Sequence, residues 1–81
     1  MRKITQADGP RIQERGRSAI KRPNPVFLLQ LDEDAEVETV DGTLTGKAGD
    51  FLAFDPISTH VWPVKASYVE QHYTFTPEGQ R

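Results

Sequence analysis

The stretch DGTLTGKAGDFLAF, residues 41–54, decides how this chain is expected to fold. It contains two turn signals, Asp41-Gly42 and Ala48-Gly49-Asp50, because glycine tolerates the positive φ angles that tight turns require. An Asp-Gly pair suits a two-residue hairpin turn in particular. The residues that follow each turn alternate or cluster as they do in strands. We therefore predict antiparallel strands over 43–47 and 51–54.

Two further strands are predicted before this stretch. Residues 26–31 read VFLLQL, a short apolar run between a proline and an acidic cluster, which is typical of a strand covered on both faces. Residues 35–40 read AEVETV and alternate cleanly, with Ala35, Val37 and Thr39 on one face. This pattern predicts a strand with one buried and one solvated face, joined to the next strand by the Asp41-Gly42 turn.

The residues after the stretch predict one more strand and a helix. Residues 61–64 read VWPV, and Pro63 cannot donate a ladder hydrogen bond, so this strand is expected at an edge or a bulge. Ser67 and Glu70 have the spacing of a capping box, which predicts a helix over residues 67–73. Its apolar face would carry residues Tyr68, Val69, His72 and Tyr73. Phe75 is expected to dock on the core.

Basic side chains are concentrated in the N-terminal segment. Residues 1–25 contain seven Lys/Arg and two acidic residues, a net charge of +5, whereas residues 26–81 carry −7. We interpret 1–25 as a basic arm that is partly ordered at best, 26–76 as a single β-rich domain, and 77–81 as a frayed C-terminus. The structural signals in the arm are a short strand around 2–6 and a helix start that Gly16 interrupts.

The arm allows two interpretations. Its basic side chains could bind nucleic acid or an acidic partner, and the candidates are Arg11, Arg15, Lys21 and Arg22. The arm contains no aromatic residue that would stack on bases. We therefore favour an arm that folds against the acidic body or is solvated.

The motifs between Val37 and Tyr73 resemble a known family. Residues 40–44 read VDGTL, 49–52 read GDFL, 62–65 read WPVK and 68–70 read YVE. In order and spacing they are similar to the PGDYG or PGDW domain of small phage and prophage proteins. Ala48 stands where that family has a proline, and the connector 55–60 differs. The resemblance implies a phage-like origin and a bacterial cytoplasmic setting, and it implies no activity.

The residues that bear chemistry do not form a convincing catalytic or metal site. The chain has no cysteine, and its two histidines, His60 and His72, would need Asp55 or Glu70 to complete a metal site. The Gly49-to-His60 spacing matches only half of a cupin metal motif. Ser58, Thr59 and His60 are consecutive, so their side chains diverge and do not suit a nucleophilic triad. We expect no enzyme activity, no metal and no cofactor.

Binding residues are easier to suggest. An acidic run over residues 32–38 lacks the glycine and terminal glutamate of a calcium loop, so we interpret it as a solvated edge whose Glu36 and Glu38 could meet a basic partner. Trp62 is the single tryptophan, and it is either a core anchor or an exposed binding hot spot. We favour the core for Trp62 and keep it among the candidate partner-binding residues.

Taken together, 81 residues with 36% hydrophobic and 27% charged side chains predict one small domain. The expected class is mainly β (α+β): a small curved antiparallel sheet or half-open SH3-like barrel with one short C-terminal helix. We expect the protein to be a non-catalytic interaction module that binds a protein partner or self-associates. We expect it to act in the cytoplasm and not to bind a membrane. The alternatives are nucleic-acid binding through the arm and inhibition of a host enzyme or defence complex.

Overall fold

The computed structural model describes residues 2–21 and 24–75, and it confirms the predicted mainly β (α+β) class. The elements, in chain order, are β1 (Arg2–Ile4), the 3₁₀ helix η1 (Gln6–Asp8), α1 (Gly9–Arg15), β2 (Arg17–Lys21), β3 (Asn24–Gln30), β4 (Ala35–Thr39), β5 (Gly42–Gly46), β6 (Phe51–Asp55), β7 (His60–Val64), α2 (Ala66–His72) and β8 (Thr74–Phe75). None of the helices in this described part has the length and apolar character needed to cross a membrane.

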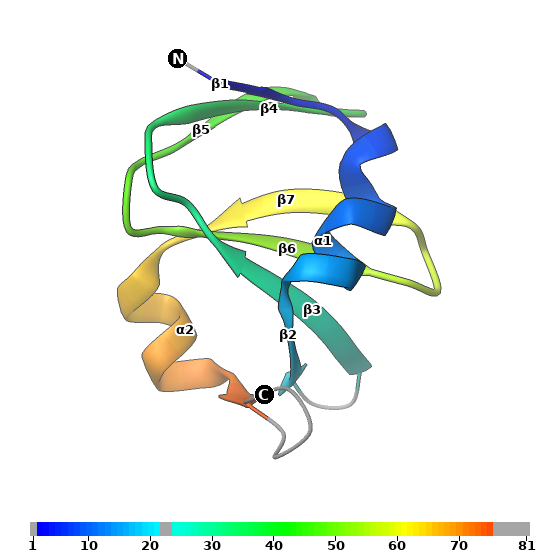
Figure 1. Ribbon diagram of the computed structural model, residues 1–81, viewed down its shortest axis with the longest axis vertical. Coiled ribbons are helices and arrows are strands. Elements are labelled where there is room, and N and C mark those ends of the chain that lie inside the picture. Colours follow the sequence, from blue (N-terminus) through cyan, green and yellow to red (C-terminus); the bar gives the residue numbers. More distant parts are fainter. Residues whose placement is uncertain (1, 22–23, 76–81) are drawn as a thin grey trace.

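The strands divide between two open sheets. The smaller has the order β1-β4-β5 and the larger the order β7-β6-β3-β2-β8. The β1–β4 pair is parallel and the other pairs are antiparallel. In Figure 1 the three-stranded sheet lies on one side of the larger sheet, with α1 beside it, and α2 lies on the opposite side. The predicted single sheet is therefore two sheets, and a second helix, α1, accompanies the C-terminal one.

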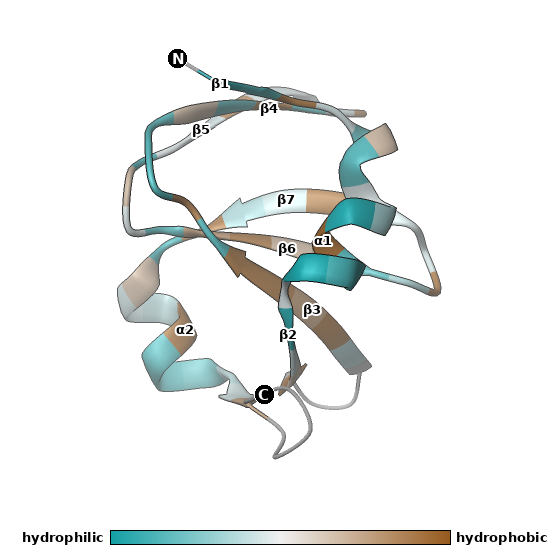
Figure 2. Ribbon diagram, viewed as in Figure 1, coloured by the Kyte–Doolittle hydropathy of each residue, from teal (hydrophilic) through white to brown (hydrophobic). Residues whose placement is uncertain are grey.

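The larger sheet is buried on both faces. One cluster fills the space toward the three-stranded sheet and α1, and its buried members are Ile4, Ile12, Leu31, Ala35, Val37, Leu52, Phe54 and Val61. The other cluster lies toward α2, and its buried members are Ala19, Val26, Leu28, Ala53, Val64, Val69 and Tyr73. β3 and β6 contribute alternate residues to both clusters. This confirms the prediction that residues 26–31 are covered on both faces, and Figure 2 shows most of β3 in the colour of apolar residues.

The N-terminal segment is an integral part of the core, which corrects the expectation of an arm that is partly ordered at best. Residues 2–21 form β1, η1, α1 and β2, and the side chains of Ile4 and Ile12 are only 2% and 1% exposed. Gly9 packs against the ring of Phe54. Gly16 does not interrupt the helix but follows its last residue, donating its N–H to the carbonyl of Ile12. A helix this short is stable because it packs against β3 and β6.

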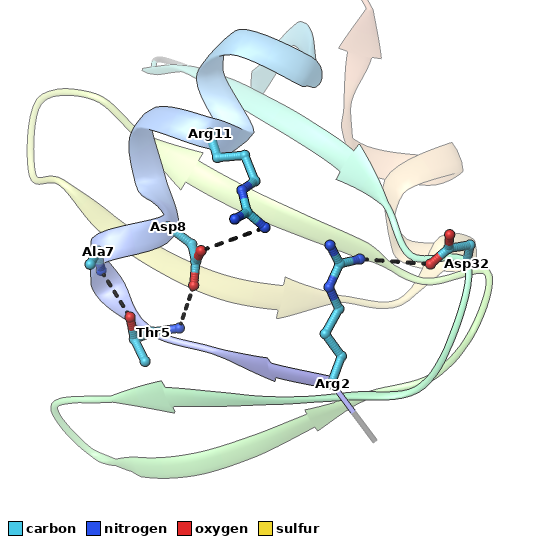
Figure 3. Close-up of polar contacts among 6 residues, drawn as sticks. All are labelled: Arg2, Thr5, Ala7, Asp8, Arg11 and Asp32. Carbon is cyan, nitrogen blue, oxygen red and sulfur yellow. Dashed lines mark hydrogen bonds and ion pairs between the residues drawn. The ribbon is translucent and has the colours of Figure 1, made fainter.

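Polar contacts hold the start of the chain in place (Figure 3). Thr5 and Asp8 form a capping box: the Asp8 carboxylate accepts the Thr5 N–H at 2.8 Å, and the Thr5 hydroxyl accepts the Ala7 N–H at 3.3 Å. Arg11 lies 4.0 Å from Asp8, and Arg2 lies 3.7 Å from Asp32. Each ion pair has one exposed member, Asp32 or Arg11, so both pairs orient the segment more than they stabilise it.

Two glycines make the expected reversals. Gly42 has φ +121° and Gly49 has φ +94°, a region that suits glycine. The first turn differs in register from the prediction, because Val40 and Asp41 occupy its centre and Gly42 begins β5. The Thr39 hydroxyl closes this turn, accepting the N–H of Asp41 and donating to the carbonyl of Gly42.

The end of the chain closes the larger sheet at β2. β8 pairs with β2 through Ala19–Phe75 and Ile20–Thr74. The Phe75 ring lies 6.3 Å from the Phe51 ring and 4.0 Å from the guanidinium carbon of Arg17. The docking expected of Phe75 is therefore confirmed. The predicted frayed segment, 77–81, lies outside the described residues.

The helix predicted over residues 67–73 is present, but its capping is different. α2 begins at Ala66. Its N-cap residue is Lys65, whose side chain makes no capping hydrogen bond. The predicted capping box of Ser67 and Glu70 is therefore wrong. Instead the Asp50 carboxylate, in the turn before β6, accepts the N–H of Ala66 at 3.2 Å and that of Lys47 at 3.1 Å.

Replacing Asp50 should therefore weaken the fold more than replacing Ser67. We expect Asp50→Ala to lower the free energy of unfolding by about 1–2 kcal/mol, because the Ala66 and Lys47 N–H groups lose their acceptor. Ser67→Ala, the control, should change it by less than about 0.5 kcal/mol. Urea denaturation of both variants checks this, and an equal effect of the two substitutions would contradict the capping role of Asp50.

Candidate interaction surface

Trp62 lies between two surface cavities and lines both of them. It lies on β7, the outer strand of the larger sheet, and pairs with Ala53 of β6. Its side chain is half-buried: it packs against the cluster beneath α2 and also lines two surface cavities. Both interpretations of Trp62 therefore describe part of its environment, since one side contacts the core and another is accessible.

The larger cavity lies between the end of β7 and α2. Its volume is about 310 Å³, and its lining residues are Trp62, Pro63, Val64, Lys65, Tyr68 and Tyr73. The Tyr68 ring lies 4.3 Å from His72 and 6.1 Å from Tyr73, centroid to centroid. Val69 and Tyr73 turn toward the core, whereas Tyr68 and His72 are exposed. The predicted apolar face of this helix is therefore split between the core and the solvent side.

The smaller cavity lies on the other side of Trp62, toward the turn between β4 and β5. Its volume is about 190 Å³, and its lining residues are Gln6, Thr39, Val40, Asp41, Leu44, His60, Val61 and Trp62. Val40 and Leu44 are 82% and 48% exposed, which is high for aliphatic side chains. Exposed apolar side chains gathered in one place are typical of contact surfaces.

The outer edge of β7 is closed by a side chain from the N-terminal segment. The Gln6 amide accepts the Val61 N–H at 2.7 Å and donates to the Val61 carbonyl at 3.0 Å, as a neighbouring strand would. It also donates to the Glu38 carbonyl of β4 at 2.6 Å, so it joins the two sheets. Pro63, the next residue with its backbone toward this edge, has no N–H to offer. The predicted edge position of this strand is thereby confirmed.

The acidic candidates lie on a different face. Glu36 and Glu38 alternate on β4 with Ala35 and Val37, which are buried toward the larger sheet. Their side chains therefore occupy the outer face of the three-stranded sheet, away from the α2 side where Trp62 packs. Glu38 is exposed and Glu36 is half-buried. The structure does not bring these two carboxylates together with Trp62.

The basic candidates are only partly placed. Arg11 and Arg15 lie one turn apart on α1, and both are exposed. Lys21 ends β2, but its side chain is outside what the structure describes, and so is Arg22. The structure therefore brings Arg11 and Arg15 to one helix face and does not test a four-residue basic site.

The histidines occupy separate positions. His60 begins β7 and pairs with Asp55, whereas His72 ends α2 and stacks on Tyr68. Within residues 2–21 and 24–75, no three His, Asp or Glu side chains are grouped to hold a metal ion. Ser58 and Thr59 belong to the turn before His60, and Asp55 organises this turn because its carboxylate accepts the N–H groups of Ile57 and Ser58.

Comparison with known proteins identifies no relative of this chain. No family model, no curated protein and no solved structure matches this chain. The residues that sequence reasoning missed are Gln6 and Lys65. Lys65 stood in the quoted WPVK motif, but no local pattern signals that Gln6 would bond residues in two other strands.

Removing the Gln6 amide should destabilise the fold. Gln6→Ala leaves the Val61 N–H and two carbonyls without their partner, so we expect the free energy of unfolding to fall by about 1–3 kcal/mol. Gln13→Ala, an exposed glutamine on α1, is the matched control and should stay within about 0.5 kcal/mol of the wild type. Denaturant titration measures both, and equal stability of Gln6→Ala and Gln13→Ala would contradict the bridge between the sheets.

Proposed function

We propose that the protein is a non-catalytic interaction module, and that the larger cavity beside Trp62 is its binding site for a protein partner. The observation that carries this proposal is the lining of that cavity. Trp62, Tyr68 and Tyr73 contribute aromatic rings, and tryptophan and tyrosine are enriched among residues that dominate binding energy. Rings of this kind offer a large contact area and lose little conformational freedom on binding.

The chemistry of the lining also suggests what binds. Lys65 is exposed and is the one charged side chain among the lining residues, so a carboxylate complements it. The remaining lining is aromatic or aliphatic, which suits an apolar side chain. Because Pro63 and the Gln6 amide block strand addition at β7, the partner would be held by its side chains. We therefore propose an extended segment with an apolar residue beside an acidic one.

The same lining supports a binding role over a catalytic one. General acid–base chemistry needs a carboxylate, imidazole or similar group within hydrogen-bond reach of the reacting atom. The lining residues include neither a carboxylate nor a histidine. Lys65, Tyr68 and Tyr73 are the lining side chains that carry a transferable proton, and the rest of the lining is apolar or indole surface that suits contact with a ligand.

The cellular setting that we propose is the bacterial cytoplasm, for a protein of phage or prophage origin. Its support is the similarity of residues 40–44, 49–52 and 62–65 to the PGDYG-type pattern. All four residues of the 62–65 motif, Trp62, Pro63, Val64 and Lys65, also line the larger cavity.

A random-peptide library selected on the immobilised protein tests the proposed site. We expect enriched peptides with an apolar residue beside an acidic one, and saturable changes in the fluorescence of Trp62, the single tryptophan, when such a peptide is titrated. Tyr68→Ala should weaken binding about thirtyfold, the size of effect expected at a hot spot. Ile57→Ala removes an exposed side chain that lines neither cavity and should leave the affinity unchanged.

Two results would overturn the proposal. One is a set of enriched peptides that bind the wild type and Tyr68→Ala equally well. The other is binding that is seen only after residues 76–81 are deleted, because it would assign the cavity to the C-terminal residues of the chain itself.

Nucleic-acid binding through α1 is the second candidate, and one observation favours it. Arg11 and Arg15 are four residues apart, so they lie on one exposed helix face. If they contact phosphates, affinity for double-stranded DNA should fall steeply with salt, and replacing both with alanine should reduce the slope of log K against log salt by about two. Lys47→Ala is the control. Absence of binding at low salt in a fluorescence-anisotropy titration would reject this candidate.

A further inference from the structure

β5 is the outer strand of the three-stranded sheet, and its sequence leaves it open to pairing. Residues 42–45 are exposed, and no charged residue or proline lies between Gly42 and Gly46. Charges and prolines are the usual devices that prevent edge-to-edge pairing. At the other edges of the described sheets, β7 is closed by Gln6 and Pro63, β1 carries Arg2 and Lys3, and β8 has two residues.

The register of β5 shows which backbone groups face outward. Thr39 and Gly42 pair across a two-residue turn, so they exchange backbone hydrogen bonds with each other. Leu44, two residues further along, does the same with Val37. The N–H and C=O groups of Thr43 and Thr45 therefore point away from β4, toward the free edge.

The sequence of β5 is symmetric about its middle residue. Gly42-Thr43-Leu44-Thr45-Gly46 reads the same in both directions. If two copies pair antiparallel about a two-fold axis at Leu44, Thr43 lies opposite Thr45 of the partner subunit. These are the residues whose backbone groups face outward, so both Thr43–Thr45 pairs would form complete hydrogen-bonded pairs. Leu44 then meets its own copy at the non-hydrogen-bonded position, where side chains approach most closely.

Charge complementarity favours the same register. Asp41 and Lys47 flank the uncharged strand at equal distances from Leu44. Antiparallel pairing centred on Leu44 brings Asp41, in the turn before β5, near Lys47 of the partner subunit, which follows the end of β5, and symmetry repeats this contact. Lys47 already lies 3.9 Å from Asp34 of its own chain. In the dimer its ammonium group would keep this neighbour and gain Asp41 of the partner subunit as a second one. Any shift of the register removes the Asp41–Lys47 match. A one-residue shift places threonine opposite leucine or glycine, and a two-residue shift places glycine opposite Leu44.

We infer that β5 pairs with β5 of a second copy of this chain, which makes a symmetric dimer with one continuous sheet of six strands. Leu44 and Val40 line the smaller cavity, so the dimer axis passes beside that cavity in both copies. The larger cavity is lined by residues of β7 and α2 and by Lys65 and Tyr73, and none of its lining residues belongs to β5. This inference goes beyond the proposed function, because the dimer needs no other protein.

Sedimentation velocity over a dilution series tests the dimer. We expect the wild type to shift from monomer to dimer as its concentration rises. Thr43→Pro removes an outward N–H in each copy and should raise the dimer dissociation constant at least about tenfold. Thr43→Val keeps that N–H and should still dimerise. A wild type that stays monomeric at all concentrations, or a Thr43→Pro dimer of unchanged affinity, would overturn the inference.

A charge exchange tests the register and does not depend on how well the proline variant folds. Asp41→Lys should weaken the dimer several-fold, because it faces Lys47 of the partner subunit, and adding Lys47→Asp should restore the affinity. Equal affinities of the single and double variants would overturn the proposed pairing. The peptide titration of Trp62 separates the two proposals, since the monomeric Thr43→Pro variant should still bind the selected peptide.

Discussion

The constraint on which the structure depends is that one sheet must be covered on both faces. β3 and β6 send apolar side chains to each side, so neither face can be left in water. A chain of 81 residues has few residues left to form a layer on each face of this sheet. α2 supplies one, and the three-stranded sheet and α1 supply the other. Ile4 and Ile12 therefore belong to the core although the residues around them are strongly basic.

The two sheets are held together partly by hydrogen bonds that the Gln6 side chain makes at the edge of β7. Gln6 satisfies both backbone groups of Val61 at the edge of β7 and reaches the carbonyl of Glu38 in the other sheet. One amide thus occupies an edge that would otherwise accept a foreign strand and fixes the distance between the sheets. β5 has no comparable protection in the described structure. The two surfaces available for association are therefore different in kind: a side-chain cavity at β7 and α2, and a backbone edge at β5.

Local patterns predicted what local physics determines. The double coverage of residues 26–31, the alternation of β6, the glycine reversals and the edge position of Pro63 all follow from residue types and periods of two. The N-terminal segment could not be predicted in this way, because α1 is too short to be stable without Phe54 and β3. The prediction of the α2 cap was wrong because the capping group is also distant in sequence: Asp50 accepts the N–H of Ala66, sixteen residues later. For the candidate site, Trp62 was recognisable by type, but its meeting with Lys65 and Tyr68 depends on how α2 docks.

The pairing of β2 with β8 has a kinetic consequence. Three of the strand pairs, β1–β4, β3–β6 and β2–β8, join segments distant in sequence, whereas the other three join consecutive strands. Distant pairings of this kind slow folding to about milliseconds to seconds, because large loops must close before those strands can pair. During synthesis the outer edge of β2 stays unpaired until Phe75 has left the ribosome. The chain thus emerges with an open strand near its beginning, and the residues that pair with it, Thr74 and Phe75, are synthesised more than fifty residues later.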